Sequence, residues 1–177
     1  IGYDTKIIFY EDGPGAKYAK SLSIETMILP LKSIFFYGAH VKFQLIVFLR
    51  FILFFPQTIF STLRLISKEN PDIVHLNTNV HITVAIAIRL TNTPVIWHIR
   101  ECMGNNKLLN YFQKKIVESC SDRIIITSNY LRRYYSDNAK IHTVYNGVDL
   151  SKFSINNSDT SLRKIYDIDE NDTVICM

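Results

Sequence analysis

The sequence predicts an α/β fold with a Rossmann-like, doubly wound parallel sheet, and three observations support this. Short runs rich in Ile and Val alternate with longer helical stretches along the chain. Two of these runs come directly after Pro71 and Pro94. The residue before a proline is kept out of the helical region, so each proline separates the preceding helix from the strand that follows. Several runs are almost continuously apolar, as expected for parallel strands that are covered on both faces. This alternation is typical of βαβ units with right-handed crossovers.

Apolar periodicity and turn residues place each expected element. The strands are expected at Lys6–Tyr10, Glu25–Leu29, Asp72–Leu76, Val95–Ile99, Arg123–Thr127 and Ile141–Tyr145. The helices fill the gaps, at Pro14–Ser21, Val41–Ser67, His81–Leu90, Leu108–Ser119, Tyr130–Tyr135 and Ser161–Tyr166. A last apolar run, Thr173–Met177, is expected to begin one more strand.

Composition indicates one main domain and the beginning of a second. A chain of 177 residues that is 47% hydrophobic is long enough to bury a core. Residues 148–160 are polar and are expected to link a domain at 1–147 to a second α/β domain that begins at 161–177. Because a strand stands close to each end, we expect the chain to be cut from a longer protein.

Charge and cysteine content narrow the class of protein. The formal net charge of +4 does not require a nucleic-acid partner, although it suits an anionic ligand or an anionic membrane surface. The three cysteines form no CxxC pair, so they indicate neither a disulfide framework nor a zinc site, and they fit a reducing, cytoplasmic compartment. The histidines lack metal-ligand spacing, so no metal is predicted.

The segment Phe35–Phe60 is strongly apolar, since it holds eight of the eleven phenylalanines. A membrane-spanning helix needs about 20 apolar residues. The charge-free run Phe51–Leu63 has only 13 residues and contains Pro56. Three interpretations stay open: a core helix kinked at Pro56, an interfacial helix with its cations near anionic headgroups, and a true membrane span.

Candidate site residues follow the strands, because ligands bind at the carboxyl ends of the strands in open α/β sheets. His98 and Arg100 share one face of the strand at Val95–Ile99. An imidazole there can donate to a sugar hydroxyl or a leaving phosphate, and a guanidinium can bind a carboxylate or phosphate. Glu101 can accept from the hydroxyls of an acceptor or hold Arg100. The alternative is a local ion pair beside a satisfied histidine.

Polar residues at three other strand exits are weaker candidates. Asn79 lies at a helix start, where side chains and free N–H groups can hold a hydroxyl or phosphate oxygen, although it can equally cap the helix. Ser128 is a good N-cap as well as a candidate ligand. Asn146 and Gly147 form a turn pair at the start of the linker, where they face any cleft between two domains.

Four tracts occur in an order that is typical of a known family. They are Pro71–His75, Pro94–Glu101, Asp122–Ser128 and Asn146–Asp149, with Phe153 shortly after the last. In this order the chain resembles the amino-terminal half of the family 4 retaining glycosyltransferases, which have the GT-B fold. The Asn-Gly-Val-Asp tract carries the most specific part of the resemblance, and the His-x-Arg-Glu strand exit comes next.

The resemblance implies that residues 1–147 are the acceptor-side Rossmann-like domain, without its first strand and glycine-rich loop. The nucleotide-sugar domain would begin after the linker. The implied reaction is a metal-free, retaining transfer of a sugar from a nucleotide sugar to a glycan or lipid-linked acceptor, without a further cofactor. His98 would be the cleft histidine near the donor sugar, and Ser128, Asn146 and Gly147 would line the cleft. The chain alone is then expected to be inactive.

The expected products are bacterial surface glycans such as capsule or lipopolysaccharide, made at the cytoplasmic face of the cell membrane. Phe35–Phe60 would supply peripheral contact with that membrane. Two other functions stay open. One is an enzyme of another class on a similar fold, such as a nucleotide-sugar epimerase, but the chain lacks the dinucleotide glycine fingerprint. The other is a non-catalytic membrane-docking or scaffold α/β module.

Overall fold

The structure is a computed structural model that describes residues 2–31, 45–136, 139–151, 153, 161–169 and 171–175. The chain divides into two compact units, residues 1–145 and residues 146–177. In the second unit the described residues form one short helix, α6 (Ser161–Ile165). The strand expected at Thr173–Met177 is wrong for its described part, 173–175, because a strand needs a neighbouring strand to satisfy its backbone groups and none pairs with this segment.

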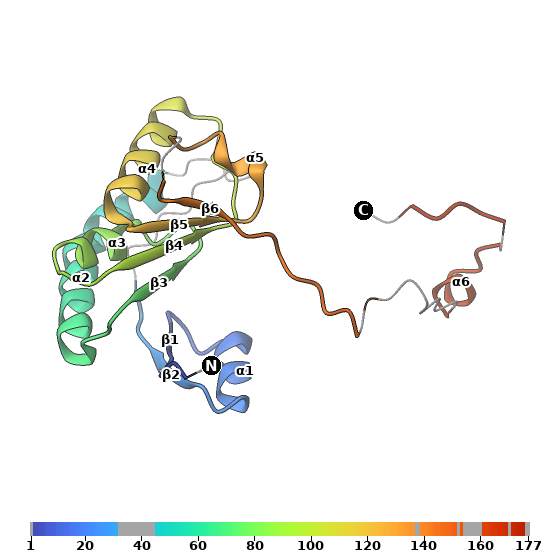
Figure 1. Ribbon diagram of the computed structural model, residues 1–177, viewed down its shortest axis with the longest axis horizontal. Helices are drawn as coiled ribbons and strands as arrows, with labels where there is room; N and C mark the ends of the chain where they lie inside the picture. The colour runs from blue at the N-terminus through green and yellow to red at the C-terminus, as the bar shows by residue number, and fades with distance from the viewer. Residues whose placement is uncertain are drawn as a thin grey trace. The chain divides into compact units, whose positions relative to one another are not determined.

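Strands and helices alternate through the first unit, as the sequence predicts (Figure 1). The elements are β1 (Lys6–Phe9), α1 (Pro14–Ser21), β2 (Glu25–Ile28), α2 (Leu45–Glu69), β3 (Val74–Asn77), α3 (Ile82–Arg89), β4 (Val95–Ile99), α4 (Lys107–Cys120), β5 (Arg123–Ile126), α5 (Asn129–Arg132) and β6 (Ile141–Thr143). The α/β class and every expected strand before the linker are confirmed, with small shifts at the element ends. The expected start of α2 at Val41 lies outside the described residues.

All six strands are paired in parallel, but they are divided between two sheets. One sheet contains β1 and β2, and the other has the order β3-β4-β5-β6. A single sheet was expected, and this is corrected: no described strand joins β1 to β3. Consecutive strands of the larger sheet are therefore neighbours in space, which is the usual arrangement for elements that follow one another along the chain. Helix α3 packs between α2 and α4 (Figure 1).

The core lies on the face of the larger sheet that bears alternate residues of β4. Val95, Trp97 and Ile99 are buried, whereas Ile96 and His98 on the opposite face are half-buried. Val117 of α4 is also completely buried in this core. Burying a large apolar side chain contributes about 1.5–3 kcal/mol each, so this face sets the rotation of β4. The same alternation places His98 on the face opposite the core.

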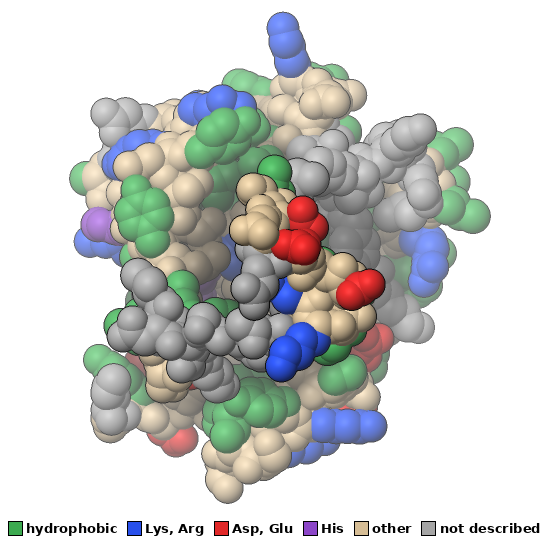
Figure 2. Space-filling view, turned by 90° about the vertical axis from the view of Figure 1, so that its right-hand side faces the viewer, with side chains coloured by type: hydrophobic (Ala, Val, Ile, Leu, Met, Phe, Trp, Pro, Cys, Tyr) green, Lys and Arg blue, Asp and Glu red, His purple; other side chains and the backbone are tan. Residues whose placement is uncertain are grey.

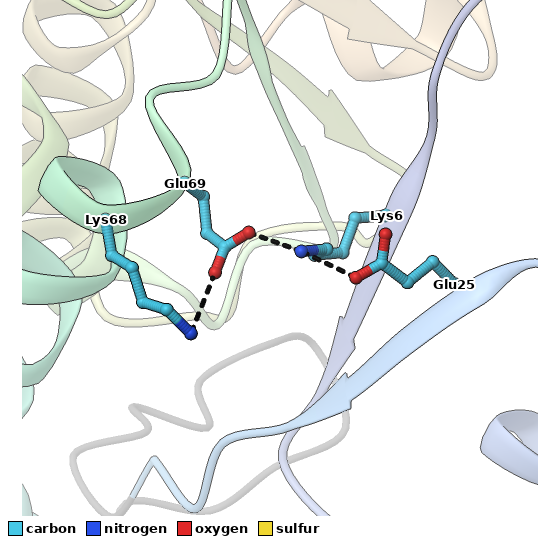
Figure 3. A network of polar contacts seen from close by, with 4 residues as sticks. All are labelled: Lys6, Glu25, Lys68 and Glu69. Carbon is cyan, nitrogen blue, oxygen red and sulfur yellow. Dashed lines mark hydrogen bonds and ion pairs between the residues drawn. The ribbon is translucent and has the colours of Figure 1, made fainter.

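A polar network joins the β1–β2 sheet to the end of α2 (Figure 3). Lys6 of β1 contacts the carboxylate of Glu25 in β2 at 2.7 Å and also that of Glu69 at the end of α2. Lys68 lies 3.4 Å from the Glu69 carboxylate. The hydrogen bonds that Lys6 donates to Glu25 and Glu69 raise the pKa of Lys6, and Lys6 in turn lowers the pKa of Glu69. The network links the β1–β2 pair to the element that precedes β3.

Helix α2 is the apolar element that the sequence singles out, and it continues through Pro56. Its segment Phe48–Glu69 is long and apolar enough to cross a membrane by length and composition alone, with 11% of the apolar window buried. Among its described residues only Thr58, Thr62 and Ile66 are buried. The interpretation of a core helix therefore applies only to the carboxyl-terminal half of α2. Residues 35–44 of the Phe-rich segment lie outside the described residues.

Candidate functional site

The candidate site lies where the strands of the larger sheet end. Because these strands are parallel, their exits share one edge, which we call the carboxyl rim: residues 77–79, 98–101 and 127–129. Asn77 pairs in register with His98, and His98 pairs with Ile125 of β5. The structure thus brings Asn79, His98, Arg100, Glu101 and Ser128 to one rim.

Glu101 connects two of the loops at this rim. Its carboxylate accepts from the Thr78 hydroxyl, from the backbone N–H of Asn79 at 3.2 Å and from the backbone N–H of Arg100 at 3.2 Å. The alternative of a local ion pair with the Arg100 guanidinium is wrong for these described residues, because the Glu101 carboxylate bonds the Arg100 backbone instead. The three hydrogen bonds let Glu101 hold the rim loops together, and its role in accepting from the hydroxyls of an acceptor stays a prediction.

Thr78 is the residue that Glu101 holds, and its backbone is left-handed, with φ of 80°. That conformation costs a residue with a Cβ roughly 1–2 kcal/mol. Further bonds offset the cost: the Trp97 indole N–H donates to the Thr78 carbonyl at 2.8 Å, and the Thr78 N–H donates to the His98 carbonyl at 2.9 Å. The loop after β3 is therefore fixed to β4 from three directions.

Asn79 follows directly and is almost completely buried, with 2% of its surface exposed. The interpretation as a helix cap is wrong, because α3 begins after His81 and no side chain caps it. The Asn79 side-chain nitrogen is buried without a hydrogen-bond partner. The amide is therefore unsatisfied, and its predicted role in substrate binding stays a prediction.

His98 is the central candidate. Its ring is half-buried and stacks on His75, with ring centroids 5.7 Å apart and planes inclined by 20°. Its Nε2 atom is buried without a hydrogen-bond partner, so the alternative of a satisfied histidine is wrong. Leaving a buried polar group unpaired costs about 1–3 kcal/mol, which a ligand or water at this atom would recover. Arg100, two residues further on, is exposed.

Ser128 and the Asn-Gly pair differ in what the structure says of them. Ser128 occupies the N-cap position of α5 with extended backbone, but its side chain makes no capping bond. Because that bond is absent, the capping alternative is not supported. Ser128 is half-exposed at the rim. Asn146 and Gly147 are exposed and belong to the second unit, so their part in the site stays a prediction.

Sequence reasoning missed Thr78, His81 and Tyr135 as neighbours of Glu101. Burial lowers the pKa of His81, and the Glu101 carboxylate partly opposes that shift. Burial, helped by the charges of Glu101 and Glu118, raises the pKa of Tyr135, whose hydroxyl is buried and unpaired. Thr78 could have been noticed as a hydroxyl at the strand exit next to Asn79, but nothing in the sequence marks Tyr135.

Two further observations limit what the site can be. Within the described ranges, no group of three His, Cys, Asp or Glu side chains could hold a metal ion. The described residues also form an open pocket beside Ser67, Asn70, Asp72 and Thr93. It lies where β3 and β4 begin, at the edge opposite the carboxyl rim, so it is not part of the candidate site.

A parallel α/β sheet with polar loops gathered at the carboxyl ends of its strands defines a Rossmann-like ligand-binding domain. The chain belongs to Glycosyltransferase Family 4, whose profile matches residues 2–152. This range includes the whole carboxyl rim and the Asn-Gly pair. No curated protein matches the chain.

The fold is similar to that of MurG from Acinetobacter baumannii. The two structures superpose with a TM-score of 0.53 at 12% sequence identity, over 86% of this chain and 39% of the MurG chain. At this identity the likeness shows the fold alone, which is the Rossmann-like domain of the GT-B architecture. The chain spans about two fifths of the length of that relative.

Proposed function

We propose that the chain is the acceptor-side domain of a retaining glycosyltransferase of the hexosyltransferase type. The enzyme moves a sugar from a nucleotide sugar to a glycan or lipid-linked acceptor, without a metal and without a cofactor besides the donor. The observation that carries this proposal is the family match over residues 2–152. The unpartnered Nε2 atom of His98 at the carboxyl rim supports it, because a bound sugar or phosphate would satisfy that atom.

The rim supplies groups that suit such a transfer. The His98 imidazole can exchange a hydrogen bond with the donor sugar or its leaving phosphate, and the exposed Arg100 guanidinium can bind the developing diphosphate charge. Ser128 offers a free hydroxyl at the same rim. Glu101 keeps the loops after β3 and β4 in place, and its remaining lone pairs can accept from the hydroxyls of the acceptor.

We also propose that residues 148–160 are an interdomain linker and that the nucleotide-sugar domain begins at 161–177. The described part of the second unit has only the short helix α6, and the chain spans 39% of the MurG chain. Donor binding in a two-domain transferase needs both lobes, so the chain alone is expected to be inactive. The parent protein carries the activity.

The exposed side of α2 supports a peripheral place at the inner face of the cell membrane. Ile46, Leu49, Leu53 and Phe60 are between 56% and 71% exposed, and their spacing of three, four and seven residues keeps them on one stripe. Three cations of α2 lie beside that stripe: Arg50, Arg64 and Lys68. An apolar stripe flanked by cations suits an anionic bilayer surface. A lipid-linked acceptor for a bacterial surface glycan such as capsule or lipopolysaccharide fits this location.

Nucleic acid is not part of the proposal, because a formal net charge of +4 does not require such a partner. On the face drawn in Figure 2, the described Lys and Arg side chains are scattered among hydrophobic and acidic ones. The exposed stripe of α2 would also serve the alternative function, a non-catalytic membrane-docking or scaffold module.

A product assay on the intact parent protein, with a panel of nucleotide sugars, separates the two functions. We expect sugar transfer from one of them, and we expect His98→Ala to reduce turnover at least about 100-fold, the usual size of a lost acid–base or electrostatic contribution. Circular dichroism must show an unchanged fold. A parent protein that transfers no sugar from any donor while binding membranes supports the docking module, and full turnover by His98→Ala removes His98 from the site.

A further inference from the structure

We propose that His75 is a positioning residue for His98, and that a charge on His98 disfavours a proton on His75. His75 lies on β3 and His98 on β4, with ring centroids 5.7 Å apart and an angle of 20° between the planes. His75 pairs in register with Ile96, two residues before His98, so the two rings share one face of the sheet. His98 belongs to the carboxyl rim, and His75 lies two residues before Asn77 of that rim.

The stacking limits how the His98 ring can turn. Trp97 and Ile99, on either side of it, are completely buried on the opposite face, which fixes the backbone of β4. On its own face the half-buried His98 lies between His75 and Ile125, its register partner on β5. The buried Nε2 atom has no partner that would orient the ring, so the orientation rests on packing. His75 is the aromatic part of that packing.

The charges around the pair disfavour double protonation. Arg123 is in register with Ile96, His142 is in register with Ile125, and Arg100 lies two residues after His98. These groups are cationic or can become so, and strands β3–β6 contribute no Asp or Glu to this face. Burial, and then the charge of His98, lower the pKa of His75. A proton on His75 is therefore opposed by burial and by a charged His98.

A neutral His98 can either donate or accept at Nε2, whereas a protonated one only donates. The consequence for sugar transfer rests on the proposed function, but the coupling between the rings does not. The test therefore uses the chain itself, with the imidazole signals of His75 followed by nuclear magnetic resonance across a pH titration. His98→Phe keeps an aromatic ring and removes the charge that faces His75, whereas His75→Ala removes the ring that packs against His98.

We expect the His75 midpoint to rise by roughly half a pH unit in His98→Phe, the Coulomb repulsion of two charges at this separation in water. His75→Ala should increase the motion of the His98 ring. His142→Phe is the matched control, since His142 lies three strands from His75, and we expect at most about half the shift. Circular dichroism checks that each variant is folded.

An unchanged His75 midpoint in His98→Phe, or equal shifts in His98→Phe and His142→Phe, overturns the proton coupling. An unchanged His98 ring order in His75→Ala overturns the positioning role. Failure of the glycosyltransferase assay alone leaves the measured coupling intact, so the two proposals fail separately.

Discussion

Replacing Glu101 should destabilise the domain through the loop after β3. The carboxylate accepts three hydrogen bonds, from the Thr78 hydroxyl and from the N–H groups of Asn79 and Arg100. A hydrogen bond to a charged group contributes roughly 1.5–3 kcal/mol, but Glu101 is only half-buried, so the lower end applies and the three contributions are not additive. We therefore expect Glu101→Ala to lower the free energy of unfolding by about 2–4 kcal/mol.

Glu101→Gln tests how much of this effect comes from charge and geometry. The amide keeps one acceptor oxygen and turns an NH2 group toward a donor, so we expect a loss of about 1–2 kcal/mol. Thr78→Gly removes the strain of the φ of 80° but also removes the hydroxyl that bonds Glu101. In the Glu101→Ala background that bond is already lost, so Thr78→Gly should cost less stability there than in the wild-type chain.

The assay is urea unfolding with a common m-value, together with hydrogen exchange of the Asn79 and Arg100 amides. These two amides should lose protection in Glu101→Ala more than amides in the core of β4. Glu11→Gln is the matched control, because Glu11 is exposed and should change stability by less than about 0.5 kcal/mol. A Glu101→Ala variant as stable as this control, with both amides still protected, would refute the reasoning.

Three further predictions concern other parts of the chain. Because the Tyr135 hydroxyl is buried and unpaired, Tyr135→Phe should be neutral or should stabilise the domain by up to about 1 kcal/mol. The raised pKa of Tyr135 means that the stability of the wild-type chain should fall as pH rises above about 10, the ordinary tyrosine value. Alkaline unfolding should show that the variant resists this fall. Because the pKa of Glu69 is lowered in the folded state, its carboxylate contributes to folding stability above the ordinary carboxyl pKa. That contribution is lost as pH falls through the lower folded value, so Glu69→Gln should flatten the acidic limb of the curve of stability against pH. A variant curve that runs parallel to the wild-type curve contradicts the Lys6 contact. Replacing Leu49 and Leu53 by Ser should weaken salt-sensitive co-sedimentation with anionic vesicles at least about threefold. Leu90→Ser is the control, because Leu90 is similarly exposed but follows the end of α3, and it should not weaken co-sedimentation. Equal effects of the two changes would remove α2 as the contact.

The sequence by itself determined the local elements and their parallel arrangement. Ile- and Val-rich runs such as Val95–Ile99 and the prolines before them have strong local preferences, so the strands fall where the pattern predicts. Residues after parallel strands must lie at one edge, so His98, Arg100 and Ser128 could be assigned to one rim before any coordinates. The order of the motifs pointed to the family that the profile match confirms.

Only the tertiary structure decided what each rim residue does. Glu101 bonds Thr78, a residue 23 positions away, and not the adjacent guanidinium, because strand register and the left-handed turn at Thr78 place that hydroxyl at its carboxylate. The contact between His75 and His98 likewise depends on the register of β3 against β4. Side-chain partners across strands depend on packing and on the angle at which loops leave the sheet. Local preference carries no information about either, which is why the sequence locates the rim but the structure assigns its hydrogen bonds.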